Sequence, residues 1–359
     1  KEIIDFISGI GASSFGHGHP NILSAIHEQV DKHLHVMVYG EMRQTAQDVA
    51  ADRLLTLLPE TLDAVYFVNS GAEAIDAAMK LVRRVTHRSK ILAVEGGYHG
   101  NTFGALSVSS NAERKAPFGP LVGDIELIPW NDMEGLEAID ASVAGIIVET
   151  VQGDAGIRIP EPEWLRAIRD KCTQTGAHLV LDEIQCGFGR TGRPFAFEHF
   201  GVEPDHLCLG KALGGGMPMG ALVSNKEYLQ QFAHSPSLGH ITTFGGHPVP
   251  CAASAAASAL LQSTDWNRVE QVGQTIEAAM RGCAHVREVR RIGLYIAVEL
   301  DSSEAVNEVV QTAMQRGVLV FYFLSTPQAF RIAPHLNIND VDLNEALDTL
   351  IACIEQAHA

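Results

Sequence analysis

The chain has 359 residues, of which 46% are hydrophobic and 19% are charged, and its formal net charge is −17 at pH 7. An acidic chain repels phosphodiester backbones, so no nucleic-acid partner is expected. The longest run of small apolar residues covers only residues 251–261, whereas a helix that crosses a bilayer needs about 20 residues. We therefore expect a globular protein without a membrane partner.

The length exceeds the roughly 250–300 residues at which a single hydrophobic core stops growing, and so predicts a large domain and a smaller one. The six cysteines are scattered, without a C-x-x-C pair or the spacing of metal ligands. They are typical of core residues in a reducing compartment, so we expect the cytoplasm. No metal site is predicted, because the histidines at 17, 19, 27, 33 and 35 also lack partners at ligand spacing.

The pattern changes along the chain and predicts an α/β fold in two parts. Residues 47–250 alternate short Val/Ile/Leu runs with amphipathic stretches, as in a mostly parallel sheet covered by helices on both faces. Residues 251–359 form a smaller α/β domain, and residues 1–46 are assigned to that domain and to a wall of the functional site. Strands of the large sheet are predicted at 64–69, 90–95, 124–129, 144–149, 177–183, 206–211 and 220–225, and the first helices of the smaller domain at 248–262 and 265–286.

A helix is predicted to begin directly after the first strand, at Ser70. Ser70 and Glu73 have the spacing of a capping box, and Gly71 lets the backbone approach a ligand closely. The N-terminus of a helix presents unpaired N–H groups and positive dipole charge, which suits a phosphate. An ordinary capped helix has the same pattern.

The strand at 177–183 ends in Asp182 and Glu183, where α/β sheets place their ligands. The glycines at 187, 189 and 192 that follow have the G-x-G-x-x-G spacing of a dinucleotide site. This alternative, a nicotinamide-dependent oxidoreductase, is disfavoured because Arg190 interrupts the motif and Pro194 stands where a helix should continue.

Lys211 follows the next strand and precedes a run of glycines. A nucleotide phosphate loop is excluded, since Ala212 occupies the position of the required Ser or Thr. A partly desolvated lysine at a strand end has a lowered pKa and can form a Schiff base, whereas a surface lysine would not need the glycines. Adjacent strands lie about 5 Å apart, so Asp182 and Lys211 can address opposite edges of one aromatic ring, as pyridoxal phosphate requires.

These motifs, in this order, resemble the class III pyridoxal-phosphate aminotransferases, the group of acetylornithine, ornithine and 4-aminobutyrate aminotransferases. The similarity runs through almost the whole chain, in DFISGI, GHGHP, NSGAEA, GGYHG, ETVQGDAGI, LVLDEIQCGFGRTG, LGKALGGGMPMGA, TTFGGHP and FRIAPHL. It implies the fold type I architecture of pyridoxal-phosphate enzymes, a homodimer and a ping-pong transfer of an amino group to a 2-oxo acid. Relatives extend further at the N-terminus, so a preceding segment is expected.

The resemblance implies a role for individual residues. Lys211 matches the lysine that forms the Schiff base and moves the proton, and Asp182 the residue that keeps the pyridine nitrogen protonated. The other implied cofactor-binding residues are Ser70, Gly71 and Ala72 at the phosphate, Tyr98 on the ring face, Gln185 at the ring hydroxyl, His99 and Glu149 in the same pocket, and Thr243 from the neighbouring subunit.

Arg331 matches the arginine that binds a substrate carboxylate, and Asp154 stands where relatives often carry a glutamate that pairs with this arginine. Asp is one methylene shorter, which weakens such a gate. Asn101 replaces an arginine that binds a distal carboxylate in many relatives. Because the same fold and lysine also support racemases, decarboxylases and aminomutases, these reactions remain the alternative.

Overall fold

The computed structural model describes residues 2–358 and contains a central seven-stranded sheet with the order β2-β8-β7-β6-β5-β3-β4. Its strands run parallel except β8, which is antiparallel to both of its neighbours. The predicted strands and the mostly parallel α/β fold are confirmed, with small differences at the strand ends. The strands are β2 (Ala64–Val68), β3 (Lys90–Val94), β4 (Ile125–Ile128), β5 (Val143–Glu149), β6 (His178–Asp182), β7 (His206–Leu209) and β8 (Gly220–Ser224).

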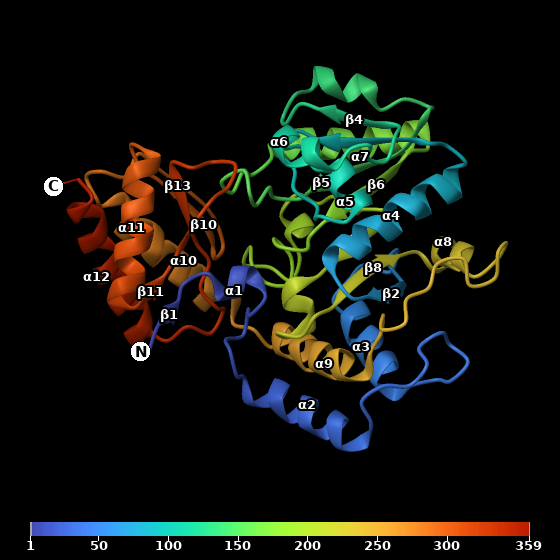
Figure 1. Cartoon of the computed structure of the whole chain (residues 1–359), viewed down its shortest axis with the longest axis horizontal. Coiled ribbons are helices and arrows are strands. Elements are labelled where there is room, and N and C mark those ends of the chain that lie inside the picture. The colour runs from blue at the N-terminus through green and yellow to red at the C-terminus, as the bar shows by residue number, and fades with distance from the viewer. Residues whose placement is uncertain (1, 359) are drawn as a thin grey trace.

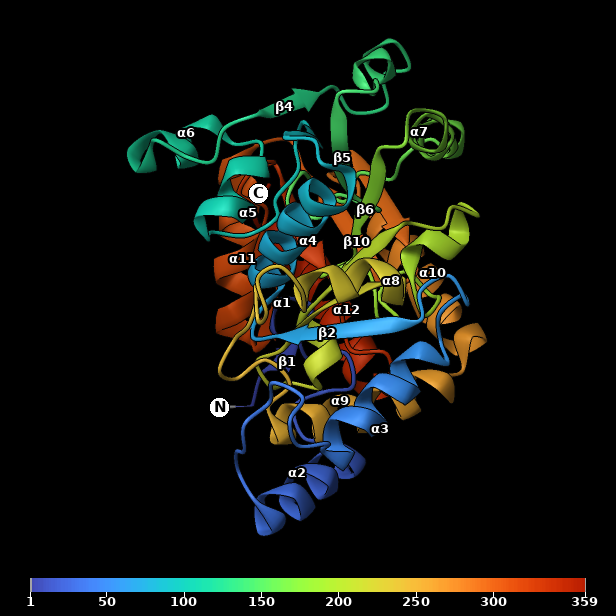
Figure 2. The same cartoon turned by 90° about the vertical axis from the view of Figure 1, so that its right-hand side faces the viewer.

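Helices cover both faces of this sheet, which is why its strands are apolar throughout. Alternate residues of β3 enter two different cores, Ile91 on the side of α4 (Gly71–Thr86) and Leu92 on the side of α7 (Pro162–Thr175). Figure 2 shows α4 and α7 on opposite sides of β5 and β6. Shorter helices in this part are α5 (Phe103–Val108), α6 (Ala112–Lys115) and α8 (Lys226–Leu229).

A second, antiparallel sheet with the order β12-β13-β10-β9 lies beside the first in Figure 1, coloured orange to red. Three helices accompany it in residues 2–358, and the first of them ends at Arg281, earlier than predicted. These elements are α10 (Trp266–Arg281), β9 (Glu288–Ile292), β10 (Tyr295–Glu299), α11 (Ser303–Arg316), β11 (Val318–Leu319), β12 (Phe321–Tyr322), β13 (Ala329–Ile332) and α12 (Asp340–Gln356).

The N-terminal segment contacts elements on both sides of the boundary at residue 250 and forms a separate two-stranded sheet. Its strand β1 (Ile4–Asp5) pairs with β11, while α2 (Pro20–Lys32) and α3 (Thr45–Leu55) pack against α9 (Pro248–Gln262), with the short α1 (Ser8–Gly11) between them. We propose the domain division at 47–250 and 251–359, with α9 as the connecting helix and residues 1–46 spanning both parts. No helix in residues 2–358 combines the length and apolar character that crossing a bilayer requires.

Candidate active site

Asp182 and Lys211 come together at the carboxyl edge of the central sheet. Strands β6 and β7 are parallel, Asp182 is paired in register with Cys208, and Lys211 follows three residues later. Burial lowers the pKa of the Lys211 amine, and the negative charge of Asp182 opposes this shift. The pair therefore combines an acid with an amine that is more readily neutral than an ordinary lysine, as a nucleophilic lysine requires.

His99 holds the Asp182 carboxylate in place. One Asp182 oxygen lies 2.7 Å from His99 Nδ1, and the other accepts the backbone N–H of Ile184 at 3.0 Å. Burial works against protonation of His99, but its hydrogen bond to Asp182 and the charges of Asp182 and Glu149 outweigh it and raise its pKa. Because an ionised carboxylate accepts about four hydrogen bonds, Asp182 keeps the capacity to face a ligand.

Glu149 ends β5, directly opposite Asp182 in register. Its two carboxylate oxygens accept the backbone N–H groups of Tyr98 at 2.8 Å and Gly153 at 2.9 Å. Burial is the main reason that its pKa rises to about 7, and Asp182 raises it further while His99 lowers it. Glu149 thus fixes the two loops that carry Tyr98 and Gly153 along the site.

The N-terminus of α4 faces the same edge. Ser70 Oγ accepts the N–H of Glu73 at 3.2 Å, which is the N-cap half of the predicted capping box. The Glu73 carboxylate accepts the N–H of Asn69 at 2.8 Å, one residue before the N-cap, instead of the N–H of Ser70. A Cβ at Gly71 would lie 2.7 Å from Ile184, so only glycine fits here. Gly71 and Ala72 form the first turn, whose backbone N–H groups have no partner within the helix.

Gln185 lies between Lys211 and the small domain. A Cβ built on Gly11 would touch both the Gln185 side chain at 3.7 Å and the Lys211 side chain at 3.9 Å, so the N-terminal segment forms one wall. A Cβ on Gly153 would lie 2.3 Å from both Gln185 Oε1 and the hydroxyl of Tyr295. The Gly153 backbone therefore passes closely between two polar groups.

Tyr98 closes the other side of the site. Asn101 donates to its hydroxyl at 3.1 Å, and the guanidinium carbon of Arg114 lies 5.7 Å from the centre of its ring. Tyr98 and Arg114 line a cavity of about 160 Å³ that also reaches Asp154 and Ser325. Within the described part of the chain Arg114 forms no ion pair, so its charge is available to a ligand.

Arg331 is 6% exposed and lies over the ring of Phe323, 4.6 Å from its centre. Its Nε has no hydrogen-bond partner, and no ion pair to Asp154 is found in residues 2–358. Asp154 instead accepts from Ser325 Oγ at 2.6 Å. Asp154 thus contacts the 324–325 loop and forms no ion pair with Arg331 in this conformation, and its part in a gate stays a prediction.

Arg190 joins the two sheets. It is buried and donates to the carbonyl oxygens of Leu294 at 3.2 Å and Pro334 at 2.6 Å, and it lies 3.4 Å from Ser14 Oγ. Burial lowers its pKa to about 10. The glycines around it form turns rather than the strand-to-helix junction of a dinucleotide site, so the oxidoreductase alternative loses its structural basis.

Thr243 stands apart from this group of residues and is exposed. The neighbouring Phe244 is 54% exposed, and its ring lies 5.0 Å from that of His35. Thr243 therefore does not join the site within one chain, which leaves its predicted role to a partner subunit.

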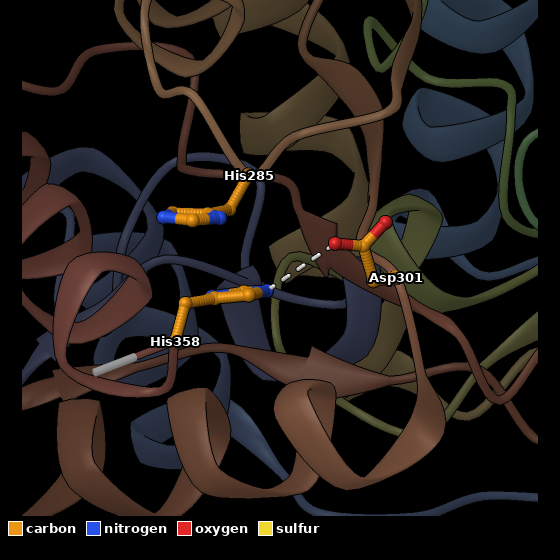
Figure 3. A group of neighbouring side chains, drawn as sticks. All are labelled: His285, Asp301 and His358. Carbon is orange, nitrogen blue, oxygen red and sulfur yellow. Dashed lines mark ion pairs between the residues drawn. The ribbon is translucent and has the colours of Figure 1, made fainter.

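A group of possible metal ligands that the sequence analysis missed lies in the small domain, at His285, Asp301 and His358 (Figure 3). The two imidazole rings are stacked, with centres 4.0 Å apart, and Arg287 is paired with Asp301. Imidazole lone pairs lie in the ring plane, and zinc binds at about 2.0–2.1 Å, so stacked rings cannot both point at one ion. As arranged, the group joins His358, which follows α12, to His285 and Asp301 in two loops of the small domain.

Several residues of the site escaped sequence reasoning, namely Tyr295, Arg114, Ile184 and Gly11. Tyr295 stands in an apolar strand and has the pattern of a core aromatic, and Arg114 lies in a short exposed helix. Nothing in their local sequence shows that the fold brings Arg114 beside Tyr98 or Tyr295 beside Gly153.

The residues present fit pyridoxal phosphate. The first turn of α4 suits its phosphate, Asp182 its pyridine nitrogen and Lys211 its aldehyde. Because Gly71 has no side chain, the backbone N–H at this position is open to a phosphate, and the close contact with Ile184 leaves no room for a Cβ.

Comparison with known proteins gives a consistent result. The family described as aminotransferase class-III matches residues 1–354. An acetylornithine aminotransferase from Methanopyrus kandleri is 42% identical over 312 residues, which is 85% of this chain and 78% of the relative. The enzyme of the same name from Methanosarcina acetivorans is 37% identical, with 99% of this chain and 87% of the relative covered.

Solved structures agree. The ornithine aminotransferase from Toxoplasma gondii, described with partial occupancy of pyridoxal phosphate at its active site, has a TM-score of 0.91 and 29% identity. The match covers 99% of this chain and 88% of that one. This chain therefore belongs to the class III aminotransferases, enzymes that transfer amino groups with pyridoxal phosphate.

Proposed function

We propose that the enzyme transfers the terminal amino group of an N-acetylornithine-type donor to a 2-oxo dicarboxylic acid. The observation that carries this proposal is the buried Arg331 guanidinium, which has an unpartnered Nε and no acidic partner among the described residues. A buried cation of this kind is costly unless an anion pairs with it, and a guanidinium binds a carboxylate through two parallel hydrogen bonds. The relatives named acetylornithine aminotransferase support the choice of donor.

The proposal gives the cofactor and each residue around it a defined role. Pyridoxal phosphate, when bound, supplies an aldehyde that takes up the amino group and a ring that acts as an electron sink. The neutral amine of Lys211 attaches the cofactor and then moves the proton at the reacting carbon. Asp182, held by His99, keeps a negative charge at the ring nitrogen. The first turn of α4, around Ser70, binds the phosphate.

Many relatives carry an arginine at the position of Asn101. In this chain Arg114 supplies the cationic group instead. It lies against Tyr98 in the cavity that also reaches Asp154, so a substrate carboxylate remote from the reacting carbon has a cationic partner there. A second cationic group at Arg114, in addition to Arg331, favours a dicarboxylic acceptor such as 2-oxoglutarate over pyruvate.

The acceptor preference tests this proposal. Replacing Arg114 by Gln is expected to raise KM for 2-oxoglutarate by about 10–100-fold, since a charge-assisted hydrogen bond contributes about 1.5–3 kcal/mol. KM for pyruvate, which lacks the second carboxylate, stays unchanged, and the exposed Arg316→Gln variant serves as the control. Steady-state kinetics with N-acetylornithine and both acceptors measure this, and equal KM changes for the two acceptors contradict the assignment of Arg114.

We also propose that the protein is a cytoplasmic homodimer in which Thr243 reaches the partner's cofactor. Six free cysteines support the reducing compartment. An exposed apolar surface supports the dimer, because patches of this kind mark interaction sites. The exposed apolar side chains of the two segments concerned, which meet where the ring of Phe244 lies 5.0 Å from that of His35, are Leu34, Met37, Met42, Leu238, Ile241 and Phe244.

Sedimentation equilibrium tests the dimer. The expected mass is twice that of the chain, and Phe244→Glu is expected to shift the population to the single chain and to abolish activity, since it places a charge in an apolar interface. A fully active single chain would refute the proposed role of Thr243.

A further inference from the structure

The small antiparallel sheet presents two polar side chains to the active site. In β10 and β13, Ala297 lies opposite Arg331, so both side chains are on one face. Tyr295 is two residues before Ala297 and therefore shares that face. Diagonal neighbours of this kind are within reach of long side chains such as tyrosine and arginine.

The hydroxyl of Tyr295 has no hydrogen-bond partner in the described structure, although the residue is only 1% exposed. A buried donor without a partner destabilises the fold, and phenylalanine would fill the same space without that cost. The hydroxyl and Gln185 Oε1 both lie 2.3 Å from the position of a Cβ built on Gly153, which places Tyr295 beside Gln185, and a Cβ built on Gly11 would lie within 4 Å of both Gln185 and Lys211.

The unpartnered Tyr295 hydroxyl and the unpartnered Nε of Arg331 therefore belong to diagonal neighbours on one face of the small sheet. Burial raises the pKa of Tyr295, and the nearby charge of Arg331 acts in the opposite direction. A phenol that stays protonated is a hydrogen-bond donor, so both groups offer donors to an anion.

We propose that Tyr295 is a second ligand of the substrate carboxylate that Arg331 binds. The phenol donates one hydrogen bond to a carboxylate oxygen, beside the guanidinium, and so fixes the orientation of the substrate relative to Lys211. This inference rests on the proposed carboxylate role of Arg331, and it adds a residue from an apolar strand that no sequence motif marks.

Binding of glutarate, a dicarboxylate without an amino or oxo group, tests this inference by isothermal titration of the holoenzyme. Tyr295→Phe is expected to raise the Kd of glutarate about tenfold, since a hydrogen bond to a charged group contributes about 1.5–3 kcal/mol. KM for the 2-oxo acid rises by a similar factor, whereas KM for butylamine, which has no carboxylate, is unchanged. The matched control is Tyr322→Phe, because Tyr322 follows Phe321, which lies opposite Arg331, and therefore faces the other side of the sheet.

Stability separates this role from a structural one. The unliganded Tyr295→Phe holoenzyme is expected to keep or raise its Tm, since the change removes an unsatisfied hydroxyl, whereas a packing role predicts a lower Tm. The inference is overturned if Tyr295→Phe binds glutarate with the Kd of the parent while Arg331→Gln binds it more weakly. That result leaves the proposed function intact. Parent-like binding in both variants overturns the carboxylate site as well.

Discussion

Lys211→Ala is expected to lower kcat/KM by at least about 10⁴-fold, because both the covalent attachment of the cofactor and the proton transfer at the reacting carbon are lost. The fold is retained, since the lysine contributes a reactive amine rather than a core contact. Absorbance spectroscopy of the purified protein with added pyridoxal phosphate measures the first effect: the band above about 400 nm that marks the attached cofactor disappears.

Lys226→Ala is the matched control, because Lys226 is an exposed lysine at the start of α8, two residues after the end of β8. Its activity and spectrum are expected to match those of the parent. A Lys211→Ala protein that still turns over N-acetylornithine at more than a trace rate would show that a different amine performs the chemistry.

Asp182→Asn is expected to lower kcat by about 10²–10³-fold, the effect of removing one preorganised electrostatic group from a buried site. The amide keeps the shape of the carboxylate but carries no negative charge to hold a proton on the ring nitrogen. Single-turnover kinetics show the loss in the chemical step. The exposed Asp170→Asn on α7 serves as the control and is expected to have no effect.

The same substitution has a second readout at His99. The hydrogen bond and the charge of Asp182 raise the pKa of His99 against the effect of burial. Without that charge, burial dominates and the pKa of His99 falls, so the imidazole stays neutral to lower pH than in the parent. NMR titration of the imidazole follows this change, and an unaltered His99 pKa in Asp182→Asn would mean that the 2.7 Å contact does not exist in solution.

The central sheet could be predicted because its strands are short and apolar throughout, as strands covered on both faces must be. The proximity of Asp182 and Lys211 followed from the same reasoning, since both stand directly after strands that turned out to be adjacent and parallel. The spacing of Ser70 and Glu73 alone predicts the start of α4. In the structure Ser70 Oγ caps the helix and the Glu73 carboxylate binds the N–H of Asn69.

Other parts of the site depend on contacts between distant segments, which local patterns do not encode. Tyr295 belongs to an apolar strand of the small domain, and only the packing of that domain against Gly153 places its hydroxyl at the site. The shorter side chain of Asp154 was expected to weaken a gate with Arg331, but its hydrogen bond to Ser325 Oγ in the 324–325 loop depends on the fold and could not be predicted. The stacked His285 and His358 are separated by much of the small domain in sequence and meet only in the fold.

The most direct test of the account is to reduce the holoenzyme with borohydride and to locate the attached pyridoxyl group by peptide mass spectrometry. The arrangement of Lys211 beside Asp182 predicts that the label is found on the peptide containing Lys211 and on no other. A label on Lys115, the other lysine whose pKa is lowered by burial, or on any other lysine would contradict it.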